Sequence, residues 1–72
     1  MVNVNKLKGK IVERGLSISE LAELIELDRT TLYRKLNSEG KKFTIEEADA
    51  IAKALQMTAG EVNAIFFSQY VA

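Results

Sequence analysis

The chain is 72 residues long, which is enough for one small domain and too short for two, so residues 1–72 are expected to form a single domain. Cysteine and histidine are both absent, which excludes disulfides, makes a metal or cofactor site unexpected and removes the commonest general base of enzymes. Ten Lys and Arg against ten Asp and Glu give a net charge of zero, which by itself argues against a nucleic-acid partner.

No stretch of the sequence is apolar for long enough to span a bilayer, and the basic amino terminus is not followed by the apolar run of a signal peptide. The expected location is therefore the cytoplasm, with no membrane partner. Glu46, Glu47 and Asp49 are closely spaced carboxylates, but they suit an ordinary helix start. Neither a catalytic site nor a small-molecule substrate is expected.

Four helix-start signals follow one another along the chain, each a Ser, Thr or Asp that can accept a hydrogen bond from the first turn of a helix. Three of them have, three residues later, the Glu that completes a capping box; the fourth, Asp28, lacks that partner. The complete boxes are Ser17 with Glu20, Thr44 with Glu47, and Thr58 with Glu61.

Together with the spacing of apolar residues, these signals predict five short helices. In the first, over about residues 5–14, Val4, Leu7, Ile11 and Val12 fall at helical spacing, and Gly15 is placed to end the helix in the left-handed conformation. The others are expected over about residues 18–25, 29–36 and 45–55 and from Thr58 onward, with a loop over residues 37–42. This set of elements predicts a compact all-α domain.

The core is expected on one apolar face of each helix. Its predicted members in the second to fourth helices are Leu21, Ala22, Leu24, Ile25, Leu32, Leu36, Ile45, Ala48, Ile51, Ala52 and Leu55.

The last nine residues, AIFFSQYVA, are rich in aromatic and β-branched side chains, and they either end the fifth helix or form an extended tail. The candidates for a homodimer interface are Phe66, Phe67, Tyr70 and Val71. The alternative is that a phenylalanine completes the thin core of its own chain.

The connection between the second and third helices is very short, with Glu26 and Leu27 separating an apolar helix face from the next cap, Asp28. Two short helices joined by a tight turn, the second of them polar on its outer face, are the elements of a helix-turn-helix. The sequence therefore predicts a helix-turn-helix over about residues 17–37.

Residues 15–37, GLSISELAELIELDRTTLYRKLN, resemble the helix-turn-helix of the phage repressor and Cro-like family, also called the XRE family. The matching positions, in the family's order and spacing, are Gly15-Leu16, Ser17, Glu20-Leu21-Ala22, Leu27, Asp28 and Leu32. Glu26 departs from the usual Gly of the turn. A left-handed backbone there costs Glu about 1 kcal/mol, so either the turn relaxes or the strain is tolerated. Ile18 departs from a Gln that holds a phosphate in many members.

The resemblance implies a repressor-like domain of five helices that binds a two-fold DNA operator as a dimer, with the third helix in the major groove. A phage or prophage regulator of Cro-like or repressor type is the function it implies, acting on transcription. The alternative, from another class, is a helix-turn-helix-shaped adaptor of antitoxin or anti-repressor type, which grips a protein partner through the aromatic carboxyl-terminal segment.

The third predicted helix has a stripe of hydrogen-bond donors opposite Leu32 and Leu36. The candidates for base contacts are Arg29, Thr30, Tyr33 and Arg34, because their side chains can pair with base edges or pack on a thymine methyl. The expected contacts to the DNA backbone are Ser17, Thr31, Asn37, Lys41 and Lys42. The alternative is that Arg29, Arg34 and Lys35 form an ordinary solvated helix face, with Tyr33 covering an edge of the core.

The net charge of zero results from four blocks of opposite sign. Residues 1–16 carry +3, residues 17–28 carry −4, residues 29–42 carry +4 and residues 43–72 carry −3. The most positive block contains the third helix and the loop after it, so the overall neutrality does not exclude double-stranded DNA as the partner. Modest non-specific affinity is expected, because acidic blocks lie nearby.

Overall fold

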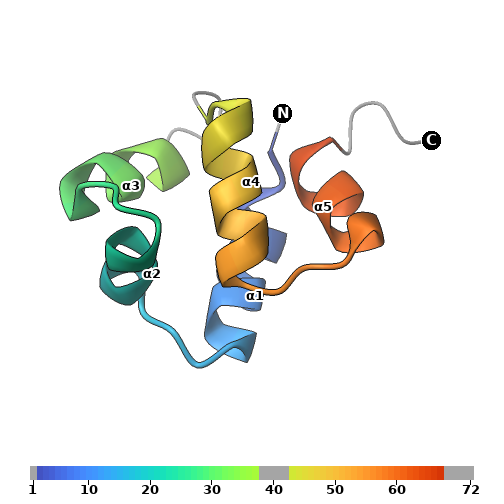
Figure 1. Cartoon of the computed structure of the whole chain (residues 1–72), viewed down its shortest axis with the longest axis horizontal. Helices are drawn as coiled ribbons and strands as arrows, with labels where there is room; N and C mark the ends of the chain where they lie inside the picture. Colours follow the sequence, from blue (N-terminus) through green and yellow to red (C-terminus); the bar gives the residue numbers. More distant parts are fainter. Residues whose placement is uncertain (1, 38–42, 68–72) are drawn as a thin grey trace.

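A computed structural model describes residues 2–37 and 43–67, and within these ranges the chain is all-α, as predicted, with no strand (Figure 1). Its five helices are α1 (Val4–Glu13), α2 (Ile18–Leu24), α3 (Arg29–Asn37), α4 (Ile45–Ala54) and α5 (Ala59–Phe66). In Figure 1, α4 crosses the middle of the molecule, with α2 and α3 on one side and α5 on the other. Helix α2 packs against α3 and α4, and α1 packs against α5.

The predicted helix starts are confirmed. Ser17, Thr44 and Thr58 each accept a hydrogen bond from the backbone N–H three residues on, and the Glu at that position accepts one in return. At the start of α3, an Asp28 carboxylate oxygen accepts from the Thr31 N–H at 3.2 Å. One start was missed: the Asn3 side chain accepts from the Lys6 N–H at 3.1 Å, so α1 begins one residue earlier than expected.

Three of the helices end with the same backbone conformation and the same hydrogen bond. Gly15, Glu26 and Gln56 have φ angles of 73°, 57° and 52°, in the left-handed region. The residue after each is apolar and donates its N–H to a carbonyl five residues back, which is the bond of a Schellman end. These bonds join Leu16 to Ile11, Leu27 to Ala22 and Met57 to Ala52 at 3.1, 2.9 and 2.9 Å.

The same three connections also continue directly into a cap, since Ser17, Asp28 and Thr58 follow the apolar residue. A left-handed residue, an apolar residue and a capping residue therefore turn the chain from one helix into the next. The Glu26 turn keeps its left-handed backbone although Gly is absent there, so the strain expected for this departure from the family pattern is present in the structure.

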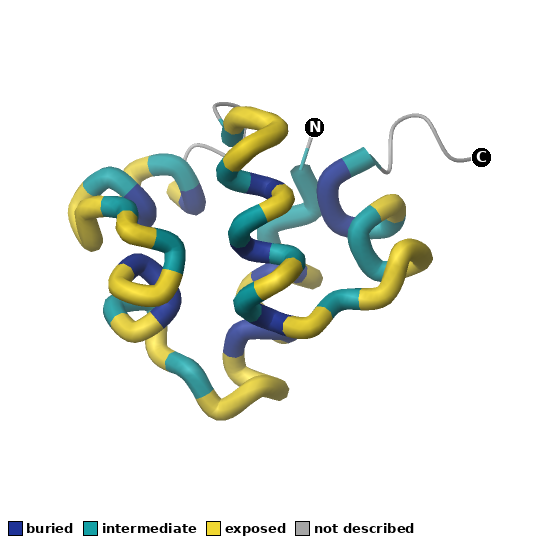
Figure 2. Tube along the Cα trace, in the orientation of Figure 1, coloured by how far each residue is buried: buried dark blue, intermediate teal, exposed yellow. Residues whose placement is uncertain are grey.

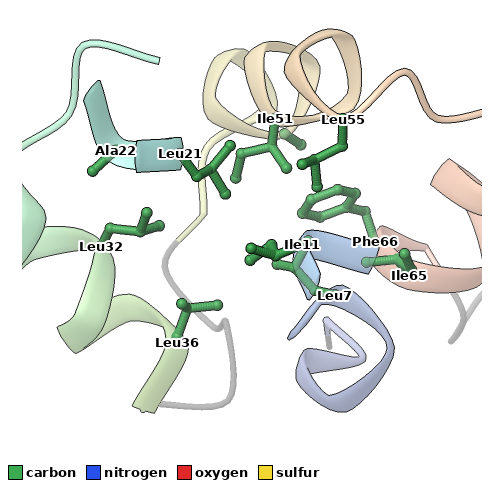
Figure 3. Close-up of a cluster of buried hydrophobic side chains, with 11 residues drawn as sticks. Leu7, Ile11, Leu21, Ala22, Leu32, Leu36, Ile51, Leu55, Ile65 and Phe66 are labelled. Carbon is green, nitrogen blue, oxygen red and sulfur yellow. The ribbon is translucent and has the colours of Figure 1, made fainter. Parts of the chain in front are cut away.

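Eleven apolar side chains from all five helices or their ends form the core (Figures 2 and 3). They are Leu7, Ile11, Leu21, Ala22, Leu32, Leu36, Ala48, Ile51, Leu55, Ile65 and Phe66. In Figure 3, Leu21, Ala22, Leu32 and Leu36 of α2 and α3 lie on one side of the cluster. Ile51 of α4, its cap residue Leu55 and the residues of α1 and α5 lie on the other.

Two predicted core residues are wrong, because Leu24 is 59% exposed and Ile45 is 79% exposed. At about 100° per residue, Leu24 points about 110° away from the centre of the α2 face that contains Leu21 and Ala22. Ile45 is the first residue of α4, at the edge of its buried face, where no preceding turn covers it. Val12 of α1 is exposed for the same angular reason as Leu24.

Polar contacts join the first helix, α1, and the residues beside it to α5 and to the end of α4. The Asn3 N–H donates to the Ile65 carbonyl at 2.7 Å. The buried Lys10 ammonium of α1 pairs with Glu13 at 2.7 Å and with Glu61 of α5 at 2.5 Å. The Arg14 guanidinium donates to the carbonyls of Leu55 and Gln56, at 2.7 and 3.1 Å, and so covers the carboxyl end of α4.

The aromatic carboxyl-terminal segment is helical as far as Phe66, with Phe67 as the cap residue of α5. Phe66 is buried, and its ring meets the Phe43 ring edge-on with centroids 6.1 Å apart. Phe66 therefore completes the core of its own chain, which was the alternative to a dimer contact, whereas Phe67 is half-buried. Tyr70, Val71 and the predicted tail lie outside the described residues. None of the described helices has the length and apolarity to cross a membrane.

Candidate nucleic-acid interface

Helices α2 and α3 form a two-helix unit with a tight turn. Four residues, 25–28, separate the last residue of α2 from the first of α3, and Glu26 makes the change of direction possible through its left-handed backbone. Buried Leu21 and Ala22 of α2 face the side of α3 that contains Leu32 (Figure 3). This is the arrangement of a helix-turn-helix, in which the second helix presents its outer face to the major groove.

The outer face of α3 is polar and exposed along its whole length. The exposed side chains are Arg29, Thr30, Tyr33, Arg34 and Asn37, whereas Leu32 and Leu36 on the opposite face are buried. All four predicted base-contacting residues are therefore brought together on one accessible surface (Figure 2, where α3 appears largely yellow and teal). We call this surface the α3 face.

The α3 face has the chemistry needed to recognise base edges. A guanidinium donates a planar pair of hydrogen bonds that fits O6 and N7 of guanine, and a Thr methyl or Tyr ring can contact the methyl group of thymine. Arg29 and Thr30 occupy the first turn of α3, which is the end that such helices insert into the groove.

The ion pairs divide the basic residues into two groups. Lys10, Lys35 and Lys53 pair with carboxylates, and Arg14 donates to backbone carbonyls. Among residues 2–37 and 43–67, Lys6, Lys8, Arg29 and Arg34 have no ion pair. Within the part of the chain that the structure describes, no carboxylate pairs with the two arginines of the α3 face, so they can meet an anionic ligand.

Lys35 belongs to α3 but not to the α3 face. Its ammonium lies 2.6 Å from both carboxylate oxygens of Glu47 in α4 and 5.9 Å from the centre of the Phe43 ring. The side chains of Lys35 and Glu47 are only 17% and 20% exposed. Of the three basic side chains for which a solvated face was the alternative, Lys35 alone is turned inward.

The carboxylate of Glu47 is held in its charged form. Partial burial raises the pKa of Glu47, but hydrogen bonds from Lys35 and from the Thr44 N–H outweigh burial and leave the pKa below its usual value. Glu47 is therefore charged at neutral pH and pairs with Lys35 as a carboxylate.

The predicted contacts to the DNA backbone differ in their exposure and in the hydrogen bonds that they already make. Ser17 is exposed, but its hydroxyl accepts from the Glu20 N–H at 3.0 Å. Thr31 is half-buried, and Asn37 is exposed at the end of α3. Lys41 and Lys42 lie outside the described residues.

A groove beside the end of α3 adds residues that the sequence did not single out. It is lined by the exposed side chains of Asn5, Lys8 and Asn37, together with Val2, Asn3, Val4 and Leu36. Lys8 therefore lies on the same side of the molecule as the carboxyl end of α3. The only sequence signal for it was the positive charge of residues 1–16, which does not distinguish Lys8 from Lys6, Lys10 or Arg14.

The tight α2–α3 turn and the exposed donors of the α3 face define a DNA-binding domain of the helix-turn-helix class. A sequence model of the Cro/C1-type HTH DNA-binding domain matches residues 6–67. The chain belongs to this family, which confirms the resemblance seen in residues 15–37. No curated protein and no solved structure matches the chain.

Proposed function

We propose that this protein is a sequence-specific regulator of transcription, of the Cro-like or repressor type found in phages and prophages, in which residues 1–72 act as one DNA-binding domain. The observation that carries the proposal is the α3 face. There Arg29 and Arg34, which have no ion pair with any described residue, lie with Thr30 and Tyr33 on an exposed helix surface. Such a protein acts where the DNA is, in the cytoplasm of a bacterial host, and regulates by binding rather than by catalysis.

In the proposed complex, α3 lies in the major groove. Arg29, Thr30, Tyr33 and Arg34 contact base edges and determine sequence preference. Ser17, Thr31, Asn37, Lys41 and Lys42 contact phosphates and determine register. Lys8 joins the phosphate-contacting set, because it lines the groove that ends at Asn37.

The proposed binding unit is a homodimer on a two-fold operator. An apolar groove lies where α4 begins and α5 ends, lined by Val2, Phe43, Ile45, Phe66 and Phe67 among others. Ile45 projects into solvent there and is 79% exposed, so a second copy that covered this groove would remove a large apolar side chain from water. Dimerisation would also reinforce a core that is small for an independent domain.

An electrophoretic mobility shift with a random-sequence duplex at low salt tests the proposal. Non-specific binding is electrostatic, so a helix-turn-helix that binds DNA retards such a duplex at micromolar concentrations, and the shift disappears as salt is raised. If no shift occurs at any protein concentration, the DNA-binding proposal fails and the adaptor hypothesis, with a protein partner at the apolar groove, takes its place.

A further inference from the structure

An ion pair holds α3 from the side opposite the α3 face. At about 100° per residue, Lys35 lies about 170° from the centre of that face, on the inward side of the helix. Its ammonium is 2.6 Å from each carboxylate oxygen of Glu47, and the two side chains are only 17% and 20% exposed. Among the described residues, this is the ion pair that joins α3 to another helix.

The start of α4 holds the Glu47 carboxylate in place. One oxygen of Glu47 accepts from the Thr44 N–H at 2.9 Å, and the Glu47 N–H donates to the Thr44 hydroxyl at 3.0 Å. Phe43, just before this capping box, meets the ring of buried Phe66 edge-on. Lys35 is therefore paired with a carboxylate whose position is set by α4 and the core.

The ion pair restrains α3 in a direction that the apolar contacts of the helix leave free. Leu32 and Leu36 are buried, but apolar contacts are not directional. Lys35 lies about 60° from Leu32 and about 100° from Leu36 around the helix, so it is beside the leucine stripe and not on it. A roll of α3 about its leucine stripe would pull the ammonium away from the carboxylate.

A small roll of α3 is enough to disturb base contacts. The radius of a helix with its side chains is about 5–6 Å, so a roll of about 10° moves the outer surface by about 1 Å. Hydrogen bonds to base edges tolerate less than this, because their donor–acceptor distances span only about 2.7–3.2 Å. A long, flexible lysine that contacts a phosphate can adapt to such a shift.

We propose that Glu47 is a positioning residue for base recognition, which acts through Lys35 to fix the rotation of α3 about its axis. This inference rests on the proposed DNA-binding function and adds to it a determinant of sequence preference that lies outside the DNA-contacting set. In the proposed complex, Glu47 acts on the bases only through the orientation of the α3 face.

A purely stabilising role for the ion pair would leave sequence preference unchanged. A lower folded fraction weakens apparent binding to a preferred and to a random duplex by the same factor. Loss of a negative charge changes the attraction to phosphates, which are the same in both duplexes. The ratio of the two affinities therefore reports the orientation of α3 separately from stability and net charge.

The test compares this ratio for the wild-type chain and for Glu47→Gln, with the duplex that the wild type selects from a random pool as the preferred one. Gln keeps an oxygen that can accept from the Thr44 N–H, so the start of α4 is retained. We expect the ratio to fall roughly five- to tenfold, about the effect of one lost base contact. An unchanged ratio for Glu47→Gln overturns the inference.

Glu46→Gln is the matched control, because it removes the same charge from the neighbouring residue, which is exposed and has no ion pair among the described residues. This variant is expected to keep the wild-type ratio. A fall equal to that of Glu47→Gln would overturn the inference, since it would show that the charge of α4, and not the contact with Lys35, affects base preference.

Lys35→Met tests the same contact from the other partner, since Met keeps an unbranched apolar stem without the charge. It should also lower the ratio, and the addition of Glu47→Gln should lower it no further, because the same contact can be lost only once. A further fall in the double variant would overturn the inference, because Glu47 would then act without Lys35. Should Glu47→Gln fail to fold, an unchanged ratio for Lys35→Met overturns the inference by itself.

Failure of the proposed function gives a different result. If the wild type binds no duplex, or binds the preferred and random duplexes equally, the proposed function fails first. If the wild type shows a preference that Glu47→Gln retains, the proposed function stands and the positioning role of Glu47 fails.

Discussion

Arg29 and Arg34 are the side chains on which sequence preference depends most in the proposed complex. Both are exposed on the α3 face and neither has an ion pair among the described residues. We expect Arg29→Ala and Arg34→Ala each to cost about 1–3 kcal/mol of binding free energy on a preferred sequence and to relax base preference. The folded structure should be unaffected, since exposed substitutions change stability by about 0.5 kcal/mol or less.

The measurement is the ratio of affinities for a selected duplex and a random duplex. Loss of affinity for both by the same factor would show that the arginines contact only phosphates. Replacement of either arginine by Lys should also lower the ratio, because an ammonium lacks the planar pair of donors.

Substitution of Lys8 tests whether the groove at the end of α3 belongs to the DNA-binding interface. Lys8→Ala is expected to weaken binding to all duplexes and to lower the salt slope by about one for each subunit, since one phosphate contact is lost. Lys6→Ala is the matched control on the same helix: Lys6 lines a different groove, between α1 and α5. Equal effects of the two substitutions on the slope would mean that only net charge matters and would remove Lys8 from the interface.

At the scale of the elements, the turn between α2 and α3 stores strain at Glu26, whose φ is 57°. Glu26→Gly is expected to raise the free energy of unfolding by up to about 1 kcal/mol, because Gly adopts this backbone without a clash of its side chain. Urea unfolding monitored by circular dichroism measures the change.

Glu23→Gly provides the contrast, since Glu23 is an exposed residue within α2. There Gly should destabilise the protein by about 1 kcal/mol. If Glu26→Gly destabilises the protein as much as Glu23→Gly does, the left-handed turn is not a source of strain.

The helices could be predicted from the sequence because their limits are set by local chemistry. Capping residues such as Ser17 and Thr44 bond within four residues of themselves, so the pattern alone locates them. The end of α4 was harder to predict, because Gln56 adopts a left-handed backbone without being Gly. Its carbonyl and that of Leu55 are satisfied by Arg14, a residue 41 or 42 positions away, which no local pattern reveals.

The face of a short helix was less predictable than its limits. Seven residues of α2 give a buried face so narrow that Leu24 falls outside it, although its composition suggested core. In the candidate site, too, one feature could be predicted from the sequence and another could not. The α3 face follows from periodicity, whereas the pairing of Lys35 with Glu47 joins two helices and has no local sequence signal.

At the scale of the whole molecule, the ion pair between α1 and α5 makes stability depend on pH. The hydrogen bond from Lys10, followed by that from the Thr58 N–H, lowers the pKa of Glu61 from its ordinary 4.5 to about 2. A carboxyl whose pKa is lower in the folded chain stabilises it above the unfolded pKa, and this contribution is lost as pH falls through the folded pKa. The stabilisation from Glu61 should therefore be complete above pH 4.5 and decline towards pH 2.

Glu61→Gln tests this dependence and keeps an oxygen for the Thr58 N–H. The variant should be less stable than the wild type at pH 7, and the difference should shrink as pH falls from about 4.5 to about 2, measured by thermal unfolding. Glu20→Gln is the control, since Glu20 has the same place in the capping box of α2 without an ion pair among the described residues. A difference that stays constant down to pH 2 would contradict the ionic role of Glu61.

The uneven distribution of charge explains how a chain of zero net charge can be a DNA-binding protein. Lys10 and Lys35 pair with carboxylates of other helices, and Arg14 covers the end of α4. Lys53 pairs with Asp49 within α4, while Arg29 and Arg34 remain on an exposed face. Acidic blocks lie close to the basic ones, so affinity should depend on base contacts and on the dimer more than in a basic protein.

Selection of bound sequences from a pool of random duplexes tests the central claim most directly. A dimer with α3 in the major groove should enrich a two-fold symmetric site whose half-sites are centred about 10 base pairs apart, each containing a guanine for an arginine contact. The enriched duplex should bind the wild type more tightly than Arg29→Ala. Retention of the pool without enrichment of any sequence would contradict the claim that the α3 face recognises bases.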